Sequence, residues 1–245
     1  LGEVIPELDV VEFDVLDVRE EPSFGMRWVS REDDWNLRIR SNRIDDQSLP
    51  QAYVVYPGIY HSQNTWLPHS QYYDSHPEYF ALIDGQRSSD PECKLCNSNP
   101  DVAVEIALNM KQYLDSNPSV ELISLSTTDG QRWCECDDCK ALDEDGVPND
   151  QKYSRRQMVL YNRVAAELEK YYPDKKILAG SYNVYTWPPA DPDMEAHTNL
   201  SVVICHYDPY CLAHPVNDPT CTDNQVYNDI ISAWQALGCD IYFYE

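Results

Sequence analysis

Glycine and basic residues are scarce in this chain of 245 residues. Only 8 glycines are present, and neither a G-x-G-x-x-G turn nor a phosphate-binding G-x-x-x-x-G-K-[ST] loop occurs. Lysine and arginine number 18 against 42 aspartates and glutamates, which gives a formal net charge of −24. Such an acidic chain repels nucleic-acid phosphates and anionic lipid surfaces. We therefore expect no nucleotide cofactor and no nucleic-acid partner.

Long apolar runs, internal repeats and Gly/Ser-rich linkers are also missing. A bilayer-spanning helix needs about 20 apolar residues, and no segment approaches that length, so we expect no membrane insertion. The chain opens at Leu1 without a basic, apolar leader, from which we expect a processed or trimmed N-terminus. The length suits one large domain with a substantial core.

Short strand patterns alternate with long amphipathic helix patterns along the chain. Helices are predicted at 100–117, 154–172 and 225–237. Strands are predicted to begin at Ala52, Val120, Lys176, Leu200 and Cys239. The alternation predicts an α/β fold with a parallel sheet, wound as a barrel or as an open doubly wound sheet.

Five clear strands fall short of the eight that a closed barrel requires. The domain division that we predict is an N-terminal strand and loop segment at 1–48, followed by the α/β domain at 49–245. Residues 67–100 lack a sustained period and are predicted to form a long functional or stapled loop.

Nine cysteines are many for an intracellular enzyme that uses no metal. Disulfides in an oxidising compartment are the favoured interpretation, which predicts a secreted, extracellular protein. The odd count leaves one thiol for self-assembly or for a covalent partner. The disulfide candidates are Cys93, Cys96, Cys134, Cys136, Cys139, Cys211 and Cys221.

A structural zinc site is the alternative use of the thiols. Two residues between cysteines allow both sulfurs to approach one tetrahedral ion. The four ligands would then be Cys96, Cys134, Cys136 and Cys139. Calcium is a further possibility at the acidic run 143–150, but the run lacks the EF-hand spacing, and a solvated loop is the preferred interpretation.

Polar side chains follow the predicted strands. Loops after parallel strands build the sites of α/β folds, so these positions are the candidates for chemistry. Asp129 could instead form an Asx-turn before Gly130, and each histidine could be a buried structural residue. The candidates are Tyr60, His61, Asp129, Tyr182, Asn183, His206, Asp208, Tyr244 and Glu245.

Amphipathic aromatic residues are abundant, with 18 Tyr and 6 Trp against only 4 Phe. Their flat faces suit the C–H side of a sugar, while the hydroxyl or indole N–H binds its edge. Carbohydrate is therefore the predicted ligand. The candidate contacts, each of which could equally be a packing residue, are Trp66, Tyr185 and Trp187.

Several motifs occur in a recognisable order, at 76–87, at 96–100, at 126–130 with the cysteines that follow, and at 211–224 and 234–244. Over about residues 50–245 they resemble the DUF4838 family (domain of unknown function). Members are mostly secreted, and the family resembles glycoside hydrolases such as hexosaminidases and α-glucuronidases. The resemblance implies a (β/α)8 TIM-type barrel, incomplete in this chain, and carbohydrate processing without a required cofactor.

A glycosidase needs two carboxyl groups that flank the scissile bond, about 5–5.5 Å apart for retention or about 6.5–9.5 Å for inversion. Asp129, as base or orienting group, and Glu245, as acid, are the predicted catalytic pair. Tyr60, His61, Tyr182, Asn183, Trp187, His206 and Asp208 are the predicted substrate-binding residues. The rival interpretation is a noncatalytic structural or glycan-binding component of an extracellular assembly.

Overall fold

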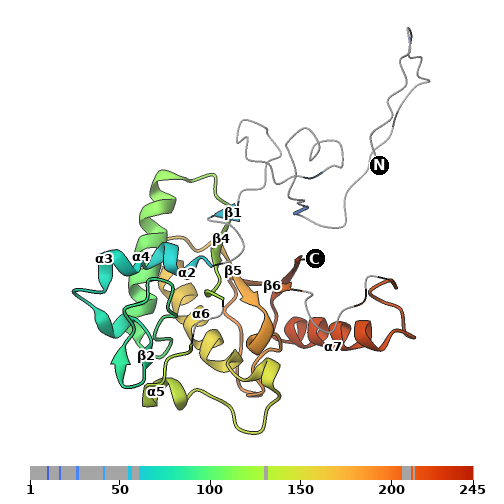
Figure 1. Ribbon diagram of the computed structural model, residues 1–245. Helices are drawn as coiled ribbons and strands as arrows, with labels where there is room; N and C mark the ends of the chain where they lie inside the picture. Colours follow the sequence, from blue (N-terminus) through green and yellow to red (C-terminus); the bar gives the residue numbers. More distant parts are fainter. Residues whose placement is uncertain are drawn as a thin grey trace.

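The computed structural model describes residues 61–129, 132–205 and 213–244, the backbone of strand residues 55–56, and positions 10, 17, 26, 27, 41 and 211. Figure 1 shows these parts as a central sheet with helices packed against it. None of its helices is long and apolar enough to cross a bilayer.

A parallel sheet of five strands forms the centre of the fold (Figure 1). Its order is β1-β4-β5-β6-β7, and every neighbouring pair is parallel. The order runs in one direction, without the reversal of a doubly wound sheet. The predicted strands and the parallel α/β fold are confirmed. The strands are β1 (Val55–Tyr56), β4 (Leu122–Leu125), β5 (Lys176–Ser181), β6 (Leu200–Cys205) and β7 (Asp240–Tyr244).

Three long helices connect these strands, as predicted. They are α4 (Pro100–Ser116), α6 (Ser154–Glu169) and α7 (Thr222–Ala236). The start of α4 is fixed by Asn99, whose side chain accepts a hydrogen bond of 2.9 Å from the Asp101 N–H, and by Pro100 in the first turn. The helix ends at Asn117, ahead of Pro118, which cannot continue it.

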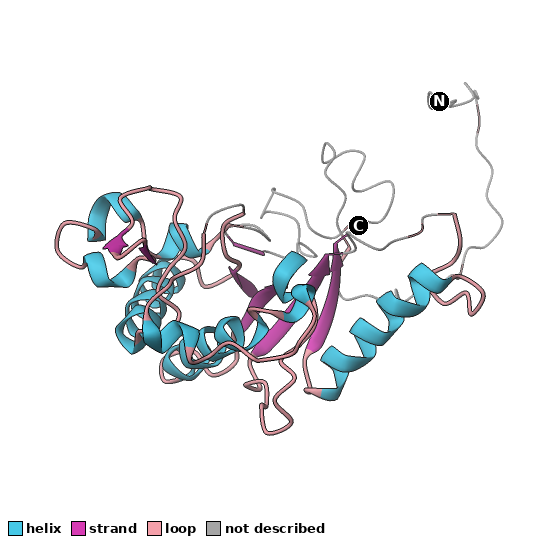
Figure 2. Ribbon diagram, turned by 60° about the horizontal axis from the view of Figure 1, so that its bottom comes forward, coloured by secondary structure: helices cyan, strands magenta, loops and turns pink. Residues whose placement is uncertain are grey.

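The long helices share one face of the sheet (Figure 2). Successive strand side chains point to opposite faces, so each strand contributes alternate residues to two clusters. Buried residues of α4, α6 and α7 pack with Ile123, Ile177 and Val202 on the first face. The opposite face carries Leu122, Leu178 and Val203, against which Met26 and Tyr242 pack.

The segment 67–100, predicted to be a long loop, contains short elements. The turn of its hairpin, Asp84-Gly85, has φ values of 50° and 79°, a left-handed pair that suits a two-residue hairpin. Helix α2 (Gln63–Trp66) ends just before the segment, and the elements within it are α3 (His69–Tyr72), the 3-10 turn η1 (Pro77–Tyr79), β2 (Leu82–Ile83) and β3 (Gln86–Arg87).

Three more short elements lie in the loops that follow β4 and β5. They are α5 (Asp137–Lys140), η2 (Asn149–Gln151) and η3 (Asn183–Tyr185). Backbone hydrogen bonds from Thr186 and Trp187 to the carbonyl of Asp150 join the η2 region to the η3 region. The loops after β4 and β5 are therefore held together.

Gly180 in β5 allows a close approach of the neighbouring strand. A Cβ atom at this position would lie 3.1 Å from Ser126 Oγ and 3.5 Å from Ser126 Cβ. We expect Gly180→Ala to lower the free energy of unfolding by about 1–2 kcal/mol, because overpacking between two buried strands forces one of them to shift. Urea denaturation measures the change. Adding Ser126→Ala removes the Oγ and is expected to recover part of the loss, whereas additive losses would contradict the steric explanation.

Candidate functional site

The candidate site lies where β1 and β4 end. These strands are parallel neighbours, so their carboxyl ends lie side by side. His61 Nε2 lies 3.2 Å from Asp129 Oδ2, and the two side chains are 49% and 59% exposed. The structure thus brings together two of the predicted site residues in a position that a solute can reach.

The backbone that leads to Asp129 is tied to the turn after β1. Ser62 Oγ accepts a hydrogen bond of 2.7 Å from the Ser126 N–H, and the Gln63 N–H donates to the carbonyl of Ser126 at 3.0 Å. Thr127 and Thr128 are buried, and among the described residues their hydroxyls have no hydrogen-bond partner. Buried polar atoms are normally paired, so two such hydroxyls next to an exposed carboxylate make this position a candidate for ligand binding.

Lys94 places a buried amine beside Asp129. Its side chain is 4% exposed and donates a hydrogen bond from Nζ to the carbonyl of Thr128. Burial lowers the pKa of Lys94 to about 8, while the charge of Asp129 acts in the opposite direction. Lys94 was not among the predicted site residues, because it follows no predicted strand and lies within the segment 67–100, which was predicted to be a long loop.

Three aromatic rings lie next to the Lys94 amine or to one another. Lys94 Nζ lies 4.7 Å from the centre of the Trp133 ring, which is 4.5 Å from the ring of Tyr153 and 5.8 Å from that of Tyr185. Burial raises the pKa of Tyr185 well above its usual value. Trp133 and Tyr153 were also missed, although Trp133 lies in the loop after β4, where the strand-end criterion applies.

Two residues at the carboxyl edge of the sheet, one after β1 and one after β5, have a left-handed backbone conformation. Asn183 is exposed and has φ 52°, and His61 has φ 54°. Both are non-glycine residues in the left-handed region, a conformation whose free-energy cost the surrounding structure must offset. Tyr182, half-buried and extended, precedes Asn183 at the start of η3.

Two tryptophans that were candidate sugar contacts make packing interactions. Trp66 is buried and donates from Nε1 to the carbonyl of Ser124 at 2.7 Å. Trp187 is half-buried, packs against the core, and donates from Nε1 to Asp150 Oδ2 at 3.0 Å. The indole N–H groups of both are therefore engaged within the protein.

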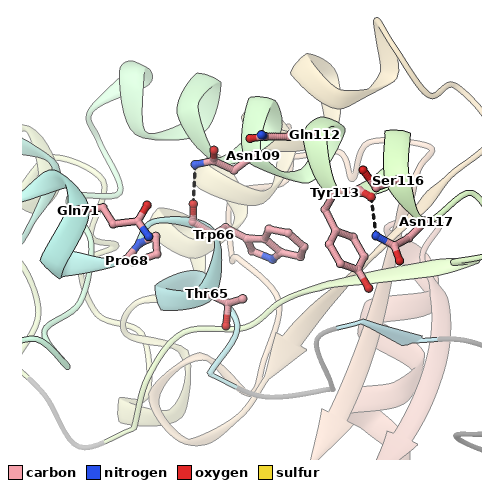
Figure 3. A pocket seen from close by; sticks show the side chains of 9 residues that line it. All are labelled: Thr65, Trp66, Pro68, Gln71, Asn109, Gln112, Tyr113, Ser116 and Asn117. Carbon is pink, nitrogen blue, oxygen red and sulfur yellow. Dashed lines mark hydrogen bonds between the residues drawn. The ribbon is translucent and has the colours of Figure 1, made fainter.

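A pocket of about 380 Å³ lies between α2 and α4, at the helical layer (Figure 3). No acidic, basic or histidine side chain lines it, and two of its four amides make internal hydrogen bonds. Asn109 Nδ2 donates to the carbonyl of Trp66 at 2.7 Å and to the Tyr72 hydroxyl at 2.8 Å, and Asn117 Nδ2 donates to the carbonyl of Tyr113 at 2.9 Å. We therefore place the candidate site at the sheet edge.

Four predicted site residues, Tyr60, His206, Asp208 and Glu245, lie outside the described residues. The catalytic pair of Asp129 and Glu245 stays a prediction.

Carboxylates of the acidic run 143–150 bind partners within the protein. Glu144 accepts from the N–H groups of Ala190 and Asp191 at 3.1 Å and 2.8 Å, and Asp143 pairs with Arg156.

Six of the nine cysteines fall into two clusters, and no two of the nine sulfurs are bonded to each other. The structure therefore gives no support to the predicted disulfides. The smaller cluster joins the half-buried Cys211, the exposed His214 and the buried Cys221, and the hydrogen bond from His214 lowers the pKa of Cys211 to about 7. The larger cluster holds Cys96, Cys134, Cys136 and Cys139.

Cys93 lies apart from the larger cluster, although it shares a C-x2-C spacing with Cys96. Its sulfur is directed at the carbonyl of Ser88, at 3.9 Å. Within the cluster, hydrogen bonds from the thiols of Cys134 and Cys139 hold the pKa of Cys96 well below its usual value.

Fold and site together define an α/β protein whose parallel sheet carries its polar groups at the carboxyl edge. The family model described as Domain of unknown function (DUF4838) matches residues 1–245, so the chain belongs to this family. The match extends through the N-terminal segment, beyond the range of 50–245 that the motifs covered. The predicted domain boundary near residue 48 stays a prediction.

No curated protein matches the chain. Among solved structures, the GH36 alpha-galactosidase AgaB from Geobacillus stearothermophilus is similar at a TM-score of 0.30 and 12% identity. The similar region covers 67% of this chain and 28% of that enzyme. The chain therefore matches little more than a quarter of the enzyme's length.

Proposed function

We propose that the carboxyl edge of the sheet binds and processes a carbohydrate, as a glycoside hydrolase-like domain of a secreted protein. The observation that carries the proposal is the exposed pair of His61 and Asp129, beside the buried amine of Lys94 and the rings of Trp133 and Tyr153. Rings that offer a flat apolar face, together with a few fixed polar groups, are the usual lining of a sugar site.

The proposed role of Asp129 is that of base or substrate-orienting carboxylate. Its solvent-exposed carboxylate can accept a proton or a hydroxyl hydrogen bond, while His61 supplies a second polar contact to the same sugar. Lys94 adds positive charge where charge would build up on an oxygen. Glycoside hydrolysis needs a second carboxyl group, for which Glu245 is our candidate.

A barrel would bring these two carboxyl groups toward each other. Asp129 follows β4 and Glu245 follows β7, three strand spacings away in the sheet. In a flat sheet that distance is about 14 Å, beyond the range for either stereochemical outcome. Curvature into a barrel turns both strand ends toward a common axis.

We propose that the five strands are an arc of a (β/α)8 barrel. Their sequential order and the position of all three long helices on one face support this fold. The opposite face carries the aliphatic residues Leu122, Leu178 and Val203, which suit the packed interior of a barrel. The proposed domain spans 49–245.

Activity measurements on extracellular polysaccharides and aryl glycosides test the function. We expect the wild-type chain to release reducing ends from one of them, and Asp129→Asn to reduce kcat by about 100-fold or more, because the variant cannot act as base. The matched control is Asp174→Asn, an exposed carboxylate before the amino end of β5, which is expected to change kcat less than twofold. Equal activity of both variants would contradict the proposed role of Asp129.

A glycan-binding component without catalysis is the second candidate function. The observation that favours it is the carboxylate of Asp129 at the sheet edge, which the strand order separates from Glu245. This function predicts sugar binding without turnover, and Trp133→Ala is expected to weaken binding by about tenfold or more, the loss of one stacked ring. Turnover by the wild type would exclude it.

A further inference from the structure

We propose that one zinc ion binds to the larger cysteine cluster as a closed structural site that positions the aromatic and cationic side chains of the sheet edge. The four ligands are Cys96, Cys134, Cys136 and Cys139. The inference does not depend on the carbohydrate proposal, because metal content is measured without any activity.

The distances between the sulfurs match a tetrahedral ion. Cys96 Sγ lies 3.7 Å from Cys136 Sγ, 3.8 Å from Cys139 Sγ and 3.7 Å from Cys134 Sγ, and the sulfurs of Cys134 and Cys136 are 3.4 Å apart. Four sulfurs about 2.3 Å from one zinc ion at the corners of a tetrahedron are separated by about 3.8 Å. A disulfide would require a separation of about 2.05 Å.

Burial makes this a closed site. Cys96, Cys134 and Cys139 are 2%, 2% and 0% exposed, and Cys136 is half-buried. Four protein ligands leave no position for water or substrate, which distinguishes structural zinc from catalytic zinc. The expected role is therefore in folding and positioning, not in chemistry.

Neighbouring donors are placed to stabilise thiolates. The Leu82 N–H donates to Cys134 Sγ at 3.3 Å, and Ser98 Oγ lies 3.1 Å from Cys139 Sγ. A guanidinium nitrogen of Arg87 lies 4.0 Å from Cys134 Sγ and donates to the carbonyl of Phe80 at 2.7 Å. Donors of this kind orient metal ligands and offset the charge of four thiolates around one divalent ion.

The cluster is also the centre of a small lobe of the structure. This Cys-rich lobe consists of the β2–β3 hairpin, the loop that carries Cys96, and residues 134–140. Ala81, Leu82 and Ile83 pack around the cysteines, while the neighbouring Phe80 and Leu95 belong to the main core. The apolar surface directly around the four sulfurs is therefore small, as is common where a metal ion contributes to folding. A bound ion would add to the stability that this packing supplies.

The lobe connects directly to the candidate site. Lys94 precedes Cys96 by two residues, and Trp133 is adjacent to Cys134. Arg156, which stacks on Tyr153 at 4.6 Å, donates from a guanidinium nitrogen to the carbonyl of Cys134 at 2.9 Å. One ion would thus fix both segments that place the amine and the indole beside Asp129.

Metal analysis of the full chain tests the proposal. We expect one equivalent of zinc in the wild type after gel filtration, and a tetrahedral thiolate spectrum when Co²⁺ replaces it. We expect Cys139→Ser to lower zinc affinity by more than about 100-fold, since loss of an outer partner alone costs about 10–100-fold. The matched control is Cys93→Ser, a buried cysteine of the same lobe, which is expected to retain full zinc content.

Alkylation of the wild type covers the case in which Cys139→Ser fails to fold. We expect zinc to protect the four ligand thiols from alkylation and a chelator to expose them, with both states mapped by peptide mass. Zinc loss in Cys93→Ser together with retention in Cys139→Ser would overturn the ligand assignment. Disulfide-linked peptides among the four cysteines, or a chain without zinc after zinc addition, would overturn the site itself.

Discussion

Asp143→Ala is expected to lower the free energy of unfolding by about 3 kcal/mol, because it leaves a buried guanidinium without its carboxylate. Arg156 is 2% exposed and donates from Nε to Asp143 Oδ1 at 2.7 Å and from a terminal nitrogen to Oδ2 at 2.5 Å. For a chain of this size the loss corresponds to a fall in Tm of roughly 6–12 °C. Differential scanning calorimetry measures it.

Asp191→Ala is the matched control, because Asp191 pairs with Arg155 at 3.2 Å near the surface. Exposed ion pairs contribute about 1 kcal/mol or less, so this variant is expected to lose much less stability. The double variant Asp143→Leu with Arg156→Met removes both charges and is expected to recover at least half of the loss. Equal effects of Asp143→Ala and Asp191→Ala would refute the buried-pair explanation.

Lys94→Met is expected to separate stability from function. A buried amine loses hydration that its hydrogen bond to Thr128 does not fully restore, so an apolar side chain of similar length is expected to raise the free energy of unfolding by about 1–3 kcal/mol. The same change removes the positive charge beside Asp129. We expect sugar binding or turnover to fall by about tenfold or more.

Chemical denaturation and activity of the same preparations measure the two effects. Lys140→Met, an exposed lysine near the same lobe, serves as the control and is expected to change stability by about 0.5 kcal/mol or less. A Lys94→Met variant that is less stable than the wild type would show that the amine serves folding and not the site. Buried charges kept against stability are typical of functional positions.

The sheet and its long helices were predictable from sequence because their signals are local. Apolar runs in β4 and β6 and the helical spacing in α4 and α6 determine these elements without reference to distant residues. The short elements within 67–100 were missed because one or two turns have no detectable period. Contacts with distant residues help to hold them in place, since the Tyr72 hydroxyl donates to Glu105 of α4 and the Leu82 N–H donates to Cys134 Sγ.

The site was predictable only in part. The strand-end rule found His61 and Asp129, since parallel strands bring their carboxyl ends to one edge. Lys94 and Trp133 reach that edge through folding of the Cys-rich lobe, which no local pattern reveals. The C-x2-C spacing could not show that Cys96 belongs to the larger cluster and Cys93 does not. The partner of Cys96, Cys134, lies 38 residues away in sequence, whereas Cys93 is directed at the nearby carbonyl of Ser88.

The connection between β5 and β6 has a consequence for how the chain folds. The described residues 182–199 contain the short turn η3 and no α-helix, so this is the shortest crossover in the sheet. A shorter loop loses less chain entropy when its ends meet, and local contacts form faster than distant ones. We therefore expect the β5–β6 pair to form before the other strand pairs, with β4 and β7 adding on either side.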